Sequence, residues 1–179
     1  MPNIRFMLSF KTNYCLILFV FISFAVFAQP KPGESFFREA EQKERSGDYQ
    51  GAVDSYSKAI MADSSNMNYF LKRGFANTLN QKYEDAITDF SFIIEENPGH
   101  LFALTSRGSA FNKLGKYEEA MADFNLVLEM DPGNQEAYNN RGWSKKFLGD
   151  FEGACKDWRK SKRLGNEEAV IILGNNFCP

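Results

Sequence analysis

Alanine recurs through the chain at a fixed interval of 34 residues, and this interval constrains the fold more than any other feature of the sequence. The recurring alanines are Ala52, Ala86, Ala120 and Ala154. Aromatic residues keep the same step, three positions before each alanine (Tyr49, Tyr83, Tyr117, Phe151) and four positions after it (Tyr56, Phe90, Phe124, Trp158). A regular period of this length is typical of repeat architectures. We therefore expect four similar units stacked in a row.

Each unit contains two stretches of about 13 residues whose apolar positions recur at helical intervals. A short turn joins the two stretches, and its central positions are Gly47, Gln81, Gly115 and Gly149. Glycine suits a helix end because it adopts the left-handed conformation without steric cost. Pro98 and Pro132 end two of the second stretches, since proline cannot continue the helical hydrogen-bond ladder. The pattern predicts an antiparallel helix pair in every unit.

Small residues recur on the first stretch of each unit, as Ala40, Gly74, Gly108 and Gly142. We expect each of them to face the repeated alanine on the second stretch, so that the two helix backbones approach closely. The flanking aromatic residues would then fill the space on either side.

The repeated strings RGFANTLNQKYEDAITDF, RGSAFNKLGKYEEAMADF and RGWSKKFLGDFEGACKDW resemble the tetratricopeptide repeat, which also has a 34-residue period. The resemblance covers roughly residues 33–166, in units of about 33–66, 67–100, 101–134 and 135–166. It implies an all-α fold, a right-handed α-solenoid of four helix-turn-helix pairs, whose first helices line most of a concave face. Residues 167–179 carry an apolar stripe and are expected to form a C-terminal capping helix and tail.

The N-terminal segment has a different character. Arg5 and Lys11 precede an apolar stretch that ends at Ala28 and spans 14 residues, fewer than the roughly 20 that a membrane-spanning helix needs. Val26 and Ala28 are short side chains at the positions that signal peptidase reads, so cleavage is expected after Ala28. An uncleaved signal anchor is the alternative interpretation.

This interpretation divides the chain into a signal peptide at residues 1–28, a short extended linker at 29–34, four repeat units within 35–166, and the capping segment. The mature protein would then have no integral membrane segment. It would be exported, either to the periplasm or as a secreted protein.

Charge and motifs limit the function. The formal net charge is −2, and removal of Arg5 and Lys11 with the signal peptide makes it −4, which disfavours a nucleic-acid partner. The sequence contains no glycine-rich phosphate loop, metal-spaced cluster or nucleophile motif. We therefore expect no catalytic residues, no cofactor, no metal and no enzymatic activity. His100, in the turn after Pro98, is expected to be a solvated loop residue.

The resemblance implies a protein–protein interaction module that binds a peptide or protein segment in its concave groove, here in the cell envelope. The alternative is a structural subunit of an envelope assembly, packed laterally or end to end, and a homo-oligomer would fit that role.

The resemblance also implies which side chains line the concave groove. They are Phe37, Leu71, Phe75, Phe102, Thr105, Asn112, Asn139, Trp143, Lys146 and Phe147. Large aromatic residues commonly anchor a bound peptide, which singles out Phe75 and Trp143. The alternative is that these two pack between neighbouring helices. The Lys/Asn/Arg set with which some family members clamp a C-terminal carboxylate is not reproduced at these positions.

Arginine and aspartate also recur together, as Arg73 with Asp89, Arg107 with Asp123, and Arg141 with Asp157. Within a helix pair the two residues lie at similar distances from the turn, which places them at similar heights. We predict an ion pair between the helices of each of these three units, with separate solvated charges as the alternative. An exposed pair would contribute less than about 1 kcal/mol to stability.

Cys155 and Cys178 are the cysteines that remain after signal cleavage. Cys155 lies ten residues before Gly165 and Cys178 thirteen after it, so a helical rise of about 1.5 Å per residue brings them to comparable heights in an antiparallel hairpin. An exported protein meets an oxidising compartment. We predict a disulfide that clamps the capping helix to the fourth pair. The alternative is a buried Cys155 with a free thiol at Cys178.

Overall fold

The structure, a computed structural model, describes residues 31–175 and 178. This part of the chain forms nine α-helices and no strand. The first helices of the pairs are α2 (Glu34–Arg45), α4 (Met67–Leu79), α6 (Leu101–Lys113) and α8 (Gln135–Phe147). The second helices are α3 (Tyr49–Ala62), α5 (Tyr83–Glu96), α7 (Tyr117–Met130) and α9 (Phe151–Arg163), and the shorter α10 (Glu167–Gly174) follows them. The predicted signal peptide lies outside the described residues, and α2 begins inside the predicted linker.

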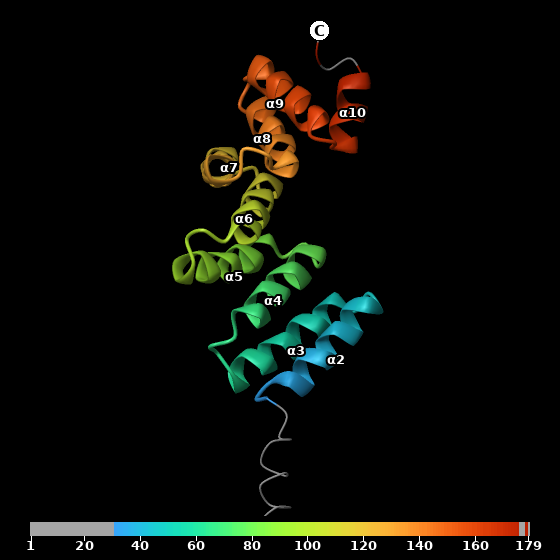
Figure 1. Cartoon of the computed structure of the whole chain (residues 1–179). Helices are drawn as coiled ribbons and strands as arrows, with labels where there is room; N and C mark the ends of the chain where they lie inside the picture. The colour runs from blue at the N-terminus through green and yellow to red at the C-terminus, as the bar shows by residue number, and fades with distance from the viewer. Residues whose placement is uncertain (1–30, 176–177, 179) are drawn as a thin grey trace, which may run out of the picture.

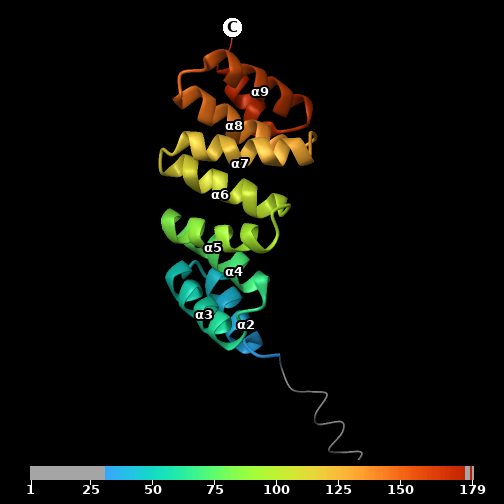
Figure 2. The same cartoon turned by 90° about the vertical axis from the view of Figure 1, so that its left-hand side faces the viewer.

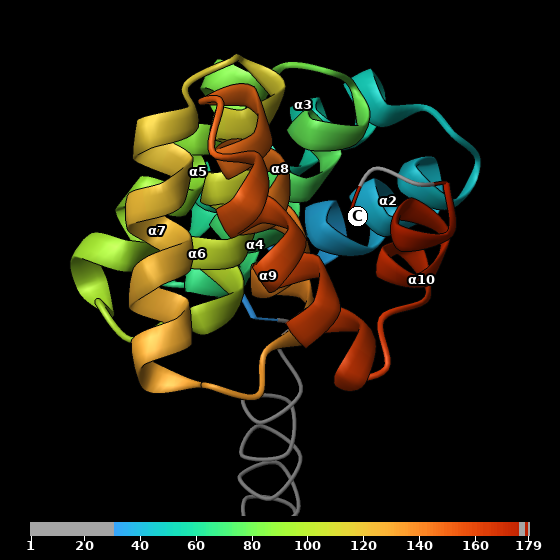
Figure 3. The same cartoon turned by 90° about the horizontal axis from the view of Figure 1, so that it is seen from above.

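The helices stack as an α-solenoid with α2 at one end and α10 at the other (Figure 1). Each helix packs against its neighbours in the chain, and α6 also contacts α8. Turned by 90°, the same stack shows successive pairs as layers (Figure 2). Seen along the stack, α5 and α7 lie on one side of the molecule, whereas α2 and α10 lie on the other (Figure 3). The fold is the predicted all-α right-handed solenoid.

The two helices of a pair approach closely at the repeated glycines, where an aromatic ring of the second helix lies against the glycine. A Cβ added at Gly74 would lie 2.7 Å from Phe90 Cε1, and one at Gly108 would lie 2.8 Å from Phe124 Cε1. At Gly142 the ring of Trp158 covers the same place. At these three glycines the nearest side chain is thus the large aromatic ring and not the expected alanine. In the first unit Ala40 and Ala52 do share one buried cluster, and all four repeated alanines are fully buried.

The turns between paired helices adopt the predicted left-handed conformation. Gly47, Gly115 and Gly149 have positive φ, and Gln81 keeps this conformation with φ 60°. A residue with a Cβ is disfavoured there by about 1 kcal/mol or more. The second unit thus holds a strained turn that the other units avoid.

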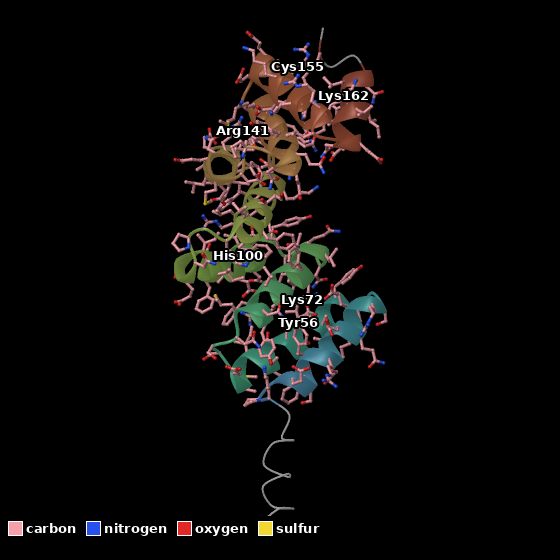
Figure 4. All side chains as sticks on the ribbon, in the orientation of Figure 1. Tyr56, Lys72, His100, Arg141, Cys155 and Lys162 are labelled. Carbon is pink, nitrogen blue, oxygen red and sulfur yellow. A yellow bond between two sulfur atoms is a disulfide. The ribbon has the colours of Figure 1, made fainter. Side chains whose placement is uncertain are left out.

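His100 is an N-cap, not the solvated loop residue that the sequence suggested. Its Nδ1 accepts a hydrogen bond of 3.1 Å from the backbone N–H of Ala103, in the first turn of α6. Asn66, Asn134 and Asn166 cap α4, α8 and α10 in the same way. The imidazole therefore substitutes for an asparagine side chain at a recurring structural position, which Figure 4 labels.

Candidate functional site

Two hollows lie between the first helices of successive pairs. The larger is a pocket of about 610 Å³ between α6, α8 and α10, which we call the C-terminal pocket. Its lining consists of Ser109, Asn112, Lys113, Tyr117, Glu136, Asn140, Trp143, Phe147 and Glu168. The smaller, of about 110 Å³, lies between α2 and α4 and is lined by Glu41, Glu44, Arg45 and Lys72.

Aromatic rings form one wall of the C-terminal pocket. Tyr117 and Phe147 stack with ring centroids 4.8 Å apart and an interplanar angle of 11°. Trp143 lies beside Phe147, with centroids 6.2 Å apart, and is held from the core side by Trp158 in an edge-to-face contact of 5.2 Å. Phe147 remains 57% exposed. The wall therefore offers a large apolar surface whose side chains are already ordered.

A chain of hydrogen bonds between α6 and α8 forms the floor of the pocket. Asn140 Nδ2 donates to Ser109 Oγ at 3.1 Å, and Asn112 Nδ2 donates to the Asn140 carbonyl at 3.1 Å. Ser144 Oγ in turn donates to Asn112 Oδ1 at 2.7 Å. These bonds fix the distance between the two helices. The exposed rim of the pocket carries charges of both signs, positive at Lys113 and negative at Glu136 and Glu168.

Four of the predicted groove residues lie at the C-terminal pocket. Asn112, Trp143 and Phe147 line it. Lys146 accompanies the aromatic wall, because its Nζ lies 4.8 Å from the centroid of the Trp143 ring. An ammonium group over an indole face is attracted by the ring quadrupole, so Lys146 adds charge to this wall.

The other aromatic groove candidates lie on α2, α4 and α6, where their rings pack against neighbouring aromatic rings. The Phe75 and Phe102 rings lie 4.8 Å apart, across α4 and α6, and Phe75 also meets the buried Phe90 ring at 5.5 Å. Phe37 contacts Tyr56 and Tyr69 in the same manner. Leu71 joins the hydrophobic cluster of the second unit. Of this group, Phe102 exposes the most surface, at 53%.

Thr105 and Asn139 do not belong to the groove surface. Thr105 is 6% exposed, and its hydroxyl donates to the Leu101 carbonyl at 2.9 Å. Asn139 is 1% exposed because α10 covers it, and its Nδ2 donates to Glu168 Oε2 at 2.8 Å. Both predictions are corrected, because a ligand cannot reach these side chains.

Among the lining residues that were not predicted from the sequence, two come from outside the first helices of the pairs. Tyr117 comes from the start of a second helix, and its recurrence three residues before an alanine indicated a core role. Glu168 comes from the capping helix, which the repeat pattern does not place. No signal in the sequence separates these two side chains from their structural counterparts.

A disulfide ties the end of the chain to the fourth pair. Cys155 on α9, labelled in Figure 4, is bonded to Cys178, with Cα atoms 5.6 Å apart. The clamp supplements the packing of Ala169 and Ile172 on the Trp158 cluster. Since α10 supplies Glu168, the disulfide holds one wall of the C-terminal pocket in place.

The predicted ion pairs between helices are confirmed in all three units. Arg107 Nε donates to Asp123 Oδ2 at 2.8 Å and its Nη2 donates to Oδ1 at 2.7 Å. The shortest distances for Arg73–Asp89 and Arg141–Asp157 are 2.6 Å and 2.8 Å. The aspartate side chains are 2–6% exposed, so these are not the exposed pairs for which a small contribution was expected.

Burial has an electrostatic consequence in the second unit. It raises the pKa of Asp89, although the hydrogen bonds from Arg73 act in the opposite direction. In the fourth unit a second cation assists, because Lys145 Nζ lies 2.8 Å from Asp157 Oδ2. The first unit has no such arginine–aspartate pair.

One unit of this solenoid matches a known protein family. Residues 102–134, which correspond to the third unit, match the tetratricopeptide repeat model. The third unit is therefore a tetratricopeptide repeat. No match was found among curated protein sequences.

Solved structures of other proteins share the fold. MamA 41-end from Desulfovibrio magneticus RS-1 is similar with a TM-score of 0.71 at 18% identity, over 77% of this chain and 78% of that chain. The first TPR of Spaghetti (RPAP3), solved bound to the HSP90 peptide SRMEEVD, is similar with a TM-score of 0.62 at 28% identity, over 68% of this chain and 96% of that chain. These similarities support a protein-interaction module.

No group of three or more His, Cys, Asp or Glu side chains among the described residues is arranged to hold a metal ion. None of the helices in that part of the chain has the length and apolar character to cross a membrane.

Proposed function

We propose that this protein binds a peptide, or an extended segment of another protein, in its concave groove, with the C-terminal pocket as the anchor site. The observation that carries the proposal is the aromatic wall beside the hollow of about 610 Å³, with Phe147 57% exposed and stacked on Tyr117. Exposed aromatic side chains that are already ordered are the usual hot spots of an interface, because they bury a large area at low entropic cost.

The side chains that line the C-terminal pocket indicate which kind of ligand it would bind. The wall suits an aromatic or long aliphatic side chain, and the rim charges of Lys113 and Glu136 suit the polar groups around such an anchor. The RPAP3 domain of similar fold is bound to an HSP90 peptide, which supports a peptide as the ligand class. The carboxylate-clamp residues are not found at the groove positions, so we propose an internal segment as the ligand, not a chain end.

We also propose that the protein acts in the periplasm or after secretion. The basic and apolar character of residues 1–28 supports export, and so does the Cys155–Cys178 disulfide, because such bonds persist in oxidising compartments. Cell fractionation with N-terminal mass spectrometry tests this. A mature protein that begins at Gln29 is expected, and an intact N-terminus on a cytoplasmic protein would contradict it.

The anchor is tested by two matched substitutions. Phe147 and Phe151 are 57% and 61% exposed, but only Phe147 lines the pocket. For peptides selected on the wild-type protein from a displayed library, Phe147→Ala should weaken binding about 10-fold or more, measured by fluorescence anisotropy. Phe151→Ala should leave the affinity within about twofold, since Phe151 lies outside the pocket. Equal affinities for the two variants would refute the assignment of the anchor.

A structural role in an assembly is the second candidate. At the end of the solenoid, α10 exposes Val170 and Ile171 at 45% and 64%. Apolar exposure there favours end-to-end packing. The oligomeric state, measured by light scattering, decides between the two functions. A monomer favours the groove binder. A defined oligomer favours the assembly subunit if the substitution Ile171→Glu dissociates it.

A further inference from the structure

One position of the first helix carries a different residue in each unit. At steps of 34 residues it is occupied by Lys43, Asn77, Phe111 and Lys145. Three of these side chains are long. Asn77 is short, and the space that the others fill remains open in the second unit.

The long side chains show what this space accepts. In the fourth unit, Lys145 Nζ lies 2.8 Å from Asp157 Oδ2, the carboxylate that also pairs with Arg141. In the first unit, Lys43 Nζ lies 2.7 Å from Glu39 Oε1. A lysine therefore binds a carboxylate from this position in two of the four units.

In the second unit the space is a pocket of about 260 Å³ between α3, α4 and α5, which we call the Asn77 pocket. Its lining consists of Val53, Ser57, Arg73, Asn77, Asp85, Thr88 and Asp89. It shares no residue with the C-terminal pocket. A ligand here would thus be additional to a peptide in the groove.

The pocket contains an acceptor that no group satisfies. Asn77 is 3% exposed, its Nδ2 donates to Asp89 Oδ2 at 3.3 Å, and its Oδ1 has no hydrogen-bond partner within the described residues. A flipped amide would direct its oxygen at the Asp89 carboxylate, so this orientation is the favourable one. A buried acceptor without a partner costs about 1–3 kcal/mol, which a donor from a ligand would offset.

The hydroxyl groups of the pocket donate within the protein, and each nitrogen of the Arg73 guanidinium already has an acceptor. Ser57 Oγ donates to the Val53 carbonyl at 2.8 Å, and Thr88 Oγ1 donates to the Glu84 carbonyl at 3.0 Å. Arg73 directs Nε and Nη2 at Asp89 and Nη1 at Ser57 Oγ. Because Asn77 Oδ1 has no partner and these donors are engaged, the pocket favours a ligand that donates hydrogen bonds.

The charge of the pocket agrees with this. Two carboxylates, from Asp85 and the buried Asp89, accompany one guanidinium, from Arg73. Burial raises the pKa of Asp89, and a second cation would act against that shift. These charges favour a ligand that is a cationic hydrogen-bond donor.

We propose that the Asn77 pocket binds a primary alkylammonium group, carried by a lysine side chain of a partner protein or by a free amine, in the place that Lys145 occupies in the fourth unit. The ammonium donates to Asn77 Oδ1 and to the Asp89 carboxylate, while its alkyl stem lies along Val53.

The test uses n-butylammonium chloride as the probe on the ¹⁵N-labelled protein. The expected result is a saturable shift of the Asn77 side-chain amide and the Arg73 Nε–H signals at millimolar probe, the range of a single solvent-accessible contact. Tetramethylammonium chloride, a cation without N–H donors, serves as the control for ionic strength. Shifts that do not saturate, or that both salts produce equally, would overturn the proposal.

Two variants that copy the protein's own units complete the test. Asn77→Lys copies the fourth unit and Asn77→Phe the third, so both are expected to fold and to fill the pocket, as circular dichroism would verify. Each should abolish the butylammonium shift, and a full shift in either would contradict the proposal. N-acetyl-lysine methylamide then distinguishes the sources, because tighter binding than butylammonium indicates a protein lysine and equal binding a free amine.

Discussion

Arg107 and Asp123 meet through two parallel hydrogen bonds across the third helix pair, from Nε to Oδ2 at 2.8 Å and from Nη2 to Oδ1 at 2.7 Å. Their side chains are 21% and 4% exposed, so solvent screens the pair only in part. Asp123→Ala should lower the free energy of unfolding by about 2–4 kcal/mol, because it leaves the guanidinium without its partner. A double-mutant cycle with Arg107→Ala should give a coupling energy of about 1 kcal/mol or more by urea unfolding. Zero coupling would show two independent charges.

Gln81 is a position where stability can be gained. Its φ of 60° suits glycine, which the corresponding turns use. Gln81→Gly should raise the free energy of unfolding by about 0.5–1 kcal/mol, since relief of strain exceeds the entropic cost of glycine. Gly115→Ala should do the opposite by a similar amount. A lower thermal midpoint for Gln81→Gly would refute this interpretation of the turn.

At Gly108, substitution by alanine should have the opposite of its usual effect on the stability of a helix. Alanine normally stabilises a helix interior by about 1 kcal/mol relative to glycine. Here its Cβ would lie 2.8 Å from Phe124 Cε1, so Gly108→Ala should destabilise the protein by about 1–3 kcal/mol. Gly99→Ala is the control, since the nearest atom to an added Cβ there is 3.7 Å away. Equal stability of the two variants would contradict the packing described for the helix pair.

The disulfide should stabilise α10 locally. Its partners are separated by 23 residues, a loop for which chain entropy predicts about 3 kcal/mol. Cys178→Ser should therefore accelerate hydrogen exchange of the α10 amides, with α5 unchanged as the internal reference. Unchanged exchange in α10 would mean that its packing on Trp158 suffices without the covalent link.

The repeat period predicted the fold, because each helix pair depends on residues that recur in the sequence. Arg107 and Asp123 illustrate this, since their equal distances from the turn indicated their contact. The pairing of glycine with an aromatic ring escaped prediction, because several recurring residues share the spacing and only their depth in the structure separates them.

The candidate site was less predictable. Trp143 and Phe147 were found because family geometry places first-helix residues in the groove. Asn139 was misplaced because α10 buries it, and α10 departs from the repeat. His100 became an N-cap through a local hydrogen bond, which neither composition nor period reveals.

The most direct test of groove binding is photo-crosslinking in the cells that produce the protein. A benzophenone amino acid replaces Phe147 in one variant and Phe151 in the other, so that both report from exposed positions but only the first from the C-terminal pocket. The account predicts a discrete adduct with a partner protein from position 147 and none from position 151. An adduct from position 151 with none from position 147 would contradict it.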